Sequence, residues 1–404
     1  MLYWRRNLYI SIVMIFIVMS SFTLVTPFMP FFLKSMDVTD NLATWSGLAS
    51  GAMFLGSALM APIWGALADR YGKKKIMLIS GLGYASMYFL YPLAKTPLQF
   101  VIMRGVTGLL AGLVPAATSF VTSNTPEQHM SYALGLFQAF NAAGSICGPL
   151  IGGSLVRMSG VATSFRLASC GMFFVTIIPY LTLREEVTKS SENRINVMRD
   201  IKICFKNPQL VTAFACLFFV QCGIQISQPT LSLYVSEMAG GGQDSALMSG
   251  AVFSVAGLGT VIGANLAGRK GNTGDGISRV RLLLFGLTGA AVFAALQGVW
   301  AAILPLVTFR TVFGLFNGVI QVAANVLIAT AVSREFRGRA FGVQNAINPI
   351  GSMAGPIIGG VVGDAFGLKS SFYASGLALL CAAGVLIGYM RRIQKADETV
   401  SASA

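Results

Sequence analysis

The sequence predicts an all-α membrane protein with twelve transmembrane helices in two six-helix pseudo-symmetric bundles. Of its 404 residues, 54% are hydrophobic and only 11% are charged, and the mean hydropathy is +0.69, whereas soluble domains carry about 25% charged residues. Twelve apolar runs are long enough to cross a bilayer, and the second six repeat features of the first six. These observations exclude a water-soluble domain, including a soluble nucleotide-binding fold or a nucleic-acid platform.

The apolar runs are separated by charged or turn-rich breaks. About 20 residues of helix cross the hydrocarbon core, and runs of this length without strand-like alternation are helices. The first run is longer than a signal-peptide core and lacks a small-residue cleavage pattern, so we expect a retained span. The predicted spans are 8–33, 44–68, 76–95, 98–122, 131–158 and 163–183, then 208–236, 246–268, 282–302, 304–330, 340–366 and 369–390.

The basic residues predict the orientation. If the N-terminus is cytoplasmic, 22 of the 29 Lys and Arg residues fall in cytoplasmic segments. Because positive charge accumulates on the cytoplasmic side of membrane proteins, both termini are predicted to be cytoplasmic. The net charge of +14 is therefore assigned to orientation and to contact with anionic lipid headgroups, and no nucleic-acid partner is expected.

A polar segment at mid-chain divides the protein into two halves. Its charged residues are interrupted by apolar ones, so it is predicted to be a linker that ends in a short amphipathic surface helix. The predicted organisation is an N-terminal six-helix bundle (1–183), a cytoplasmic linker (184–207), a C-terminal six-helix bundle (208–391) and a cytoplasmic tail (392–404).

The two halves share special residues at equivalent places. The segment from Gly144 to Gly153 matches the segment 351–360 at seven of ten positions, with a shift of 207 residues. The pattern Arg104-x3-Gly-x3-Gly recurs from Arg310. Parallel repeats around a pseudo-two-fold axis form a cavity between them, and rocking one half against the other exposes that cavity to alternate sides. The repeat therefore predicts alternating access.

Three motifs resemble those of the major facilitator superfamily. The segment 65–75, Gly-Ala-Leu-Ala-Asp-Arg-Tyr-Gly-Lys-Lys-Lys, resembles its signature loop between spans two and three. The segment 144–153 is similar to the span-five motif of its drug exporters, which its importers generally lack, and the span-four arginine pattern is similar to that of its proton-coupled members. The resemblance covers the whole chain and includes the bacterial twelve-span multidrug exporters. It implies a conformational latch of Gly65, Asp69, Arg70, Gly72 and Lys73, an arginine motif of Arg104, Gly108 and Gly112, and an antiporter-type motif of Gly144, Gly148, Pro149, Gly152 and Gly153.

Physical arguments support these roles. A carboxylate at Asp69 can pair locally or cap the N-terminus of a neighbouring helix, and the second contact exists in only one arrangement of the two halves. Pro149 removes a backbone donor in mid-helix, so we expect a kink that lets span five lie tightly against a neighbour and seal the non-cytoplasmic half. Arg104 and Arg310 lie within their spans, where charge is costly and marks function, although Arg310 could extend to the outer headgroups.

Amide side chains recur on single faces of the spans. In lipid an amide without hydrogen-bond partners is costly, so these faces are predicted to point inward, toward substrate or toward partner helices, two roles that the sequence leaves open. With Arg310, the predicted cavity residues are Gln138, Asn141, Gln221, Gln225, Gln228, Asn317, Gln321, Asn325, Asn345 and Asn348.

The sequence thus predicts a secondary active efflux transporter that exports small amphiphilic compounds by alternating access. A metabolite importer or uniporter of the same fold is the alternative. All fifteen Asp and Glu residues fall at span ends or in loops, which argues against selection of multivalent cations. The spans contain no catalytic or metal-binding constellation, so neither an enzyme, a metal nor a cofactor is expected. The resemblance implies a multi-pass protein of the bacterial cytoplasmic membrane that acts as a proton antiporter, and the expected partners are membrane lipid, a small-molecule substrate and protons, with the protein a monomer.

Overall fold

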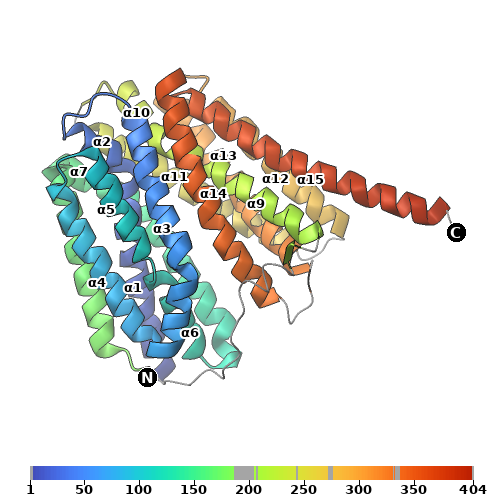
Figure 1. Ribbon diagram of the computed structural model, residues 1–404, viewed down its shortest axis with the longest axis horizontal. Coiled ribbons are helices and arrows are strands. Elements are labelled where there is room, and N and C mark those ends of the chain that lie inside the picture. Colours follow the sequence, from blue (N-terminus) through green and yellow to red (C-terminus); the bar gives the residue numbers. More distant parts are fainter. Residues whose placement is uncertain are drawn as a thin grey trace.

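The computed structural model describes residues 3–185, 204–205, 208–242, 244–271, 276–330, 332 and 337–402. These residues form helices and short connections, with no strand among them (Figure 1). Ten segments of the described chain are long and apolar enough to cross a membrane. One of these, Glu127–Thr182, has 56 residues, twice the length of a span, and Val280–Leu296 is a shorter apolar helix. The all-helical membrane fold is therefore confirmed, and twelve spans are consistent with this count.

The N-terminal bundle contains the first six predicted spans. The chain reverses inside α7 at Gly160, whose φ of +80° favours a residue without a side chain. This reversal falls in the gap predicted between spans five and six. The elements are α1 (Tyr3–Val25), η1 (Thr26–Phe28), α2 (Met29–Lys34), α3 (Leu42–Tyr71), α4 (Lys73–Leu90), η2 (Tyr91–Leu93), α5 (Pro97–Leu109), α6 (Leu113–Ser123), η3 (Glu127–His129) and α7 (Met130–Thr182).

The C-terminal bundle repeats this plan. The ninth span of the chain ends at Leu296, six residues before its predicted end. The last helix continues through the predicted tail to Ala402. The surface helix predicted for the linker lies outside the described residues. The elements are α9 (Pro208–Ile226), α10 (Gln228–Met238), α11 (Asp244–Gly271), α12 (Gly276–Leu296), α13 (Ile303–Thr330), α14 (Arg337–Phe366) and α15 (Ser370–Ala402).

Each bundle has its own apolar core. The larger cluster of buried side chains runs from Trp4 to Leu183, entirely within the N-terminal half. The next runs from Cys204 to Leu386, within the C-terminal half. Since neither core crosses between the halves, each bundle can move as a unit.

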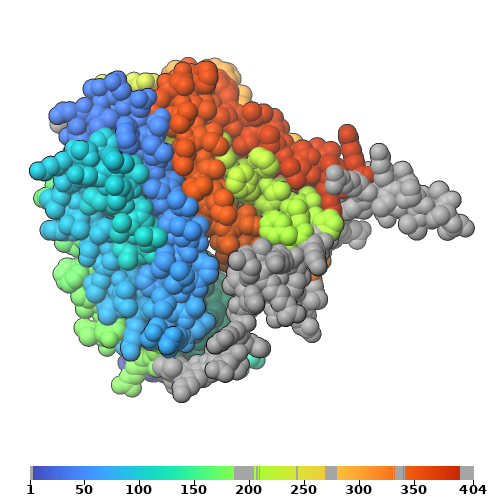
Figure 2. All heavy atoms as spheres, viewed as in Figure 1, coloured from blue at the N-terminus to red at the C-terminus, as the bar shows by residue number. Residues whose placement is uncertain are grey.

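The bundles meet along two helix pairs, α3 with α14 and α7 with α11. Glycines remove side chains where the helices meet, which allows close backbone approach. A Cβ atom built on Gly153 would overlap the backbone of α11 at Ala246, and one on Gly360 would overlap the backbone of α3 at Ala43. Figure 2 shows the surface of α14 lying directly against that of α3.

The two ends of the molecule differ. At the end that we call the linker end, the side chain of Asn7 donates to the carbonyl of Arg184, and the backbone N–H of Lys73 donates to Glu185. The opposite end, which holds α2, α10 and the reversal at Gly160, we call the far end. The bundles meet at the far end and diverge toward the linker end (Figure 1).

Candidate functional site

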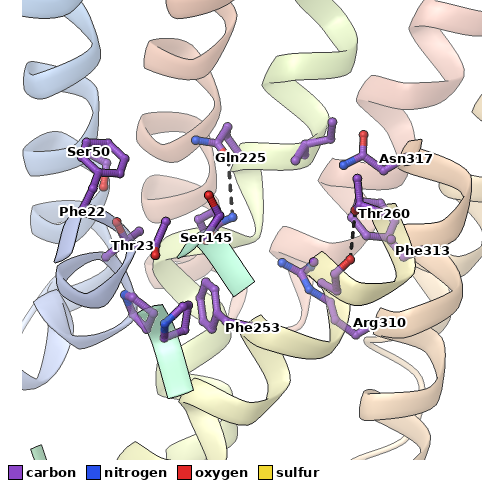
Figure 3. Close-up of a pocket in the computed structure, with 18 of the residues that line it drawn as sticks. Phe22, Thr23, Ser50, Ser145, Gln225, Phe253, Thr260, Arg310, Phe313 and Asn317 are labelled. Atoms are coloured by element: carbon purple, nitrogen blue, oxygen red, sulfur yellow. Dashed lines mark hydrogen bonds between the residues drawn. The ribbon is translucent and has the colours of Figure 1, made fainter. Parts of the chain in front are cut away.

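A cavity of roughly 250 Å³ lies between the bundles. Figure 3 shows Phe22, Thr23 and Ser50 on one side of it, from α1 and α3 of the N-terminal bundle. Gln225 and Asn317 face them from α9 and α13 of the C-terminal bundle. The cavity therefore lies where the pseudo-symmetric repeat predicts it.

Arg104 lines this cavity from α5 and is 2% exposed. Its Nε and one terminal nitrogen are buried without a hydrogen-bond partner among the described residues. The guanidinium lies 5.9 Å from the ring centre of Tyr91, a distance at which the ring face attracts a cation. Buried donors without partners are costly, so this arginine has capacity to bind a further acceptor.

Arg310 lines the same cavity from α13 and is 3% exposed. One terminal nitrogen donates to Ser227 at 3.0 Å and to Gln297 at 3.2 Å. The guanidinium carbon also lies 5.3 Å from the ring centre of Phe313 and 6.0 Å from that of Phe253. Arg310 is thus held inside its bundle, and the alternative that it extends to the headgroups is wrong.

The cavity lining contains these two arginines and no Asp or Glu. Positive charge in a low-dielectric site is costly without a counter-charge. The lining therefore favours a bound group that accepts hydrogen bonds or carries negative charge over a dication.

The predicted amides divide into two groups. Gln225, Gln228 and Asn317 line the central cavity, and buried oxygens of Gln228 and Asn317 have no partner among the described groups. The other predicted residues do not line it. Asn325 accepts a hydrogen bond from Gln344 of α14 at 2.9 Å, so that amide joins two helices. Asn141 lines a second cavity inside the N-terminal bundle. The other predicted amides outside the central cavity are Gln138, Gln221, Gln321, Asn325, Asn345 and Asn348, and their contact with substrate stays a prediction.

The glycines of spans four and five are packing surfaces. A Cβ on Gly108 would overlap the backbone of α3 at Met53, and one on Gly112 would meet the ring of Trp64. In α7, one face of the motif packs on α1 and the other on α11. Gly144, Gly148 and Gly152 lie against α1, whereas Pro149 lies against Gly250 of α11 and lines the cavity.

The loop between α3 and α4 is capped by a residue that the sequence analysis missed. Gly72 has φ +94° and no side chain to cap α4. Instead Glu185 accepts from the backbone N–H groups of Lys73 at 2.7 Å and Lys74 at 3.1 Å, as carboxylates do at helix N-termini. Asp69 is exposed in the last turn of α3, and Gly65 and Arg70 on the same helix are also exposed.

At the far end, one carboxylate links the bundles. Asp364 of α14 accepts from the backbone N–H groups of Ala43 at 3.3 Å and Thr44 at 2.7 Å. The residue that precedes α3, Asn41, supplies no side-chain cap of its own. The N-terminus of α3 is therefore capped from the opposite bundle.

Two further polar contacts join the bundles. Ser254 of α11 donates to the carbonyl of Ile146 at 2.6 Å, in the turn that precedes Pro149. Arg157 and Asp244 form an exposed ion pair at 3.0 Å. All the cross-bundle hydrogen bonds and ion pairs between described residues lie from mid-span to the far end.

Other lining residues had no distinctive signal in the sequence. The hydroxyls of Thr23, Ser50 and Ser145 and the rings of Phe22 and Phe253 line the cavity, but residues of these types occur throughout the spans. His129 is half-buried and stacks on Trp4 with ring centres 4.7 Å apart.

Known proteins resemble this chain over its whole length. The sequence model described as "Major Facilitator Superfamily" matches residues 11–273 and 270–403. A "Multidrug resistance protein MdtG" of Rahnella sp. (strain Y9602) is 30% identical over 387 residues, covering 94% of this chain and 92% of that protein. The protein of the same name from Enterobacter lignolyticus (strain SCF1) is 30% identical over 380 residues, covering 93% and 90%.

Solved structures share the fold. A bacterial homologue of the human lysosomal transporter Spinster, in an inward-facing and unoccupied conformation, has a TM-score of 0.79 at 18% identity and covers 98% of each chain. The nucleoside transporter NupG has a TM-score of 0.79 at 14% identity, covering 95% of this chain and 98% of that one.

Proposed function

The chain belongs to the Major Facilitator Superfamily, and we propose that it exports small amphiphilic compounds as a multidrug efflux transporter, by proton antiport across the bacterial cytoplasmic membrane. The observation that carries the proposal is the cavity between two pseudo-symmetric bundles, with a buried arginine contributed by each. The full-length similarity to multidrug resistance proteins supports the direction and the kind of substrate. The protein acts as a monomer, since one chain supplies both walls.

Transport requires the contacts at the far end to break. With the cytoplasmic termini that the charge distribution predicts, the far end faces outward, and the cavity is separated from the outside by the pairs α3–α14 and α7–α11. A rocking motion that opens these pairs and closes the linker end releases the substrate outward. The glycine-lined contacts suit this motion because they contain few side chains to rearrange.

Proton coupling is assigned to Asp69, the carboxylate of the predicted conformational latch. No Asp or Glu lines the central cavity. Protons and substrate therefore cannot compete for a carboxylate inside it. Asp69 at the end of α3 is the carboxylate that can attract a helix N-terminus of the other bundle when the linker end closes. A proton shifts such an equilibrium only through its different affinity for the two states. Protonation of Asp69 would weaken the latch.

The orientation is tested by labelling. Cysteines introduced beside Lys74 and near Asn193 are expected to react only with reagent on the cytoplasmic side of intact cells, because positive charge concentrates around both positions. Reaction of either with an impermeant reagent added outside would overturn the topology.

The function is tested by efflux from liposomes that contain the purified protein and an imposed pH gradient. Neutral, zwitterionic and anionic compounds are expected to be exported at least as well as monovalent cations, and dications poorly, because the lining has arginines and amides but no carboxylate. Selective export of a dicationic dye would contradict the charge assignment. Net uptake driven by the substrate gradient alone would favour the metabolite importer or uniporter instead.

A further inference from the structure

A second cavity, which we call the N-bundle cavity, lies inside the N-terminal bundle. Its volume is roughly 310 Å³, and its walls come from α1, α3, α4, α6 and α7 and the junction between α5 and α6. Phe22, Met53 and Phe54 line both this cavity and the central one. The two spaces are therefore adjacent and share a wall.

The N-bundle cavity is apolar. Of the thirteen residues that line it, only Ser57, Tyr84 and Asn141 have a polar side-chain atom. Met19 and Met172 are among the rest, and methionine adapts its shape to ligands of different outlines. The cavity contains no charge, so it suits an apolar ring or chain.

The pseudo-symmetry shows that the C-terminal bundle differs at the equivalent positions. Gly144 packs on the carbonyl of Phe16 in the first half, and Gly351 packs on that of Phe218 in the second. These contacts match α1 with α9 at a shift of 202 residues. The residue equivalent to Met19 is therefore Gln221.

The same comparison applies to span four. Gly83 packs on Leu110 in the first half, and Gly289 packs on Phe316 in the second, a shift of 206 residues that also relates Arg104 to Arg310. In the N-bundle cavity, Ala111 is then equivalent to Asn317 and Pro115 is equivalent to Gln321.

The two walls of the transport pathway are therefore chemically unequal. Three apolar positions around the N-bundle cavity are amides in the C-terminal bundle. Of these amides, Asn317 lines the central cavity, and its Oδ1 atom is buried without a partner among the described residues. Two chemically identical walls would bind a substrate equally well in two opposite orientations. An apolar wall that faces an amide wall binds an amphiphile in one orientation, with its apolar part against the apolar wall.

We propose that the N-bundle cavity is a binding subsite for the apolar part of an amphiphilic substrate, whose polar part is held by the C-terminal amides that line the central cavity, Gln225, Gln228 and Asn317. The proposal rests on the proposed function, because it concerns the substrate of the same pathway. It assigns to each bundle a different part of the ligand.

The test exchanges one N-bundle residue for the residue at its pseudo-equivalent position and measures equilibrium binding. The probe is N-phenyl-1-naphthylamine, a neutral apolar dye that fluoresces in apolar surroundings, titrated onto protein in nanodiscs with empty nanodiscs subtracted. Ala111→Asn, which places an amide in the N-bundle cavity, is expected to raise the Kd about tenfold. The matched control makes the same change at Ala162, which is exposed on α7 and lines neither cavity, and Ala162→Asn is expected to keep the wild-type Kd within about twofold. Thermal unfolding of both variants checks that they fold.

A second measurement does not depend on that exchange. In Met19→Cys, at a half-buried position of the same cavity, bound dye is expected to slow alkylation of the new thiol by N-ethylmaleimide at least fivefold, as read by mass spectrometry of the tryptic peptide 7–34, which contains no native cysteine. Equal dye affinity in wild type and Ala111→Asn, or alkylation of the new cysteine that dye does not slow, overturns the subsite.

These binding measurements use no gradient. If the dye binds as expected but nothing is exported from liposomes, the export function fails and the subsite stands. If export is normal and the exchange leaves dye affinity unchanged, the subsite fails and the export function stands.

Discussion

The two ends of the molecule are held by different kinds of contact. At the far end Asp364 of one bundle caps a helix of the other, and an ion pair and glycine-lined backbone contacts accompany it. At the linker end Glu185 also caps a helix, but that helix, α4, belongs to the N-terminal bundle, which Glu185 directly follows in the chain. The far end is thus closed by contacts that a rocking motion must break, whereas the caps at the linker end survive it.

Helix α3 takes part in both ends. Its first N–H groups are bound by Asp364, and its last turn carries the exposed Asp69. The comparison leads us to expect that Asp69 makes its contact with the other bundle only after the far end opens. Each carboxylate then stabilises one of the two states, and the following changes test that division.

The largest effect is expected from a side chain placed in the far-end contact. In Gly360→Ala the new Cβ would overlap the backbone of α3 at Ala43, and backbone cannot move aside without separating the bundles. We expect efflux to fall at least tenfold with normal membrane levels, since alanine is a better helix former than glycine. The control is Gly342→Ala on the same helix, where a Cβ meets nothing within 4 Å. Equal efflux from the two variants would remove the close contact from the mechanism.

Loss of the charge at Asp69 is expected to have the next largest effect. Asp69→Asn should reduce efflux driven by a pH gradient about tenfold, while substrate binding and membrane levels stay normal, because the variant removes an attraction that exists in one state only. Asp37→Asn is the control, since Asp37 is exposed at the far end and its φ of +60° is one that asparagine also adopts. If Asp37→Asn alone abolished proton coupling, the proton pathway would have to be sought at that end, near Arg104.

A smaller effect is expected at Asp364. Asparagine keeps one acceptor oxygen but loses the negative charge at the N-terminus of α3, an interaction worth about 0.3–1 kcal/mol. Asp364→Asn should therefore shift the population toward the far-end-open state about two- to fivefold, measured as faster alkylation of a cysteine placed at Ser50 in the cavity from the outside. The control is Glu237→Gln, since Glu237 is an exposed carboxylate at the same end, and this variant should leave the alkylation rate unchanged. An equal rise of the rate in both variants would show that loss of negative charge in general, and not loss of the cap, is responsible.

Much of the fold could be predicted from the sequence because lipid imposes simple rules. Length, hydropathy and charge predicted the spans, and most ends agree with the helices within a few residues. The repeat of the Gly-Pro-x-x-Gly-Gly pattern also predicted that spans five and eleven occupy equivalent places, and their glycines make equivalent contacts on α1 and α9.

The polar contacts were harder to predict. The roles of Glu185 and Asp364 depend on which helix N-terminus lies beside each carboxylate, and that is a property of the packed bundles. The amides show the same limit. The sequence indicates that the face of α9 with Gln221 and Gln225 points inward, but it does not show which of these side chains reaches a cavity. Only Gln225 lines the central cavity, whereas the side chain of Gln221 packs on Gly351.

The central claim, that the far end must open for export, is tested most directly by closing it covalently. Arg157 and Asp244, one from each bundle, are exposed and paired at 3.0 Å, so cysteines in both places can be joined by a short bis-methanethiosulfonate linker that replaces the length of the arginine side chain. An exposed ion pair contributes at most about 1 kcal/mol, and the double variant without linker should export at close to the wild-type rate. We predict that the cross-link abolishes efflux from liposomes and that its release by a reductant restores efflux, while each single-cysteine variant is unaffected by the reagent. Wild-type efflux from fully cross-linked protein would contradict the claim.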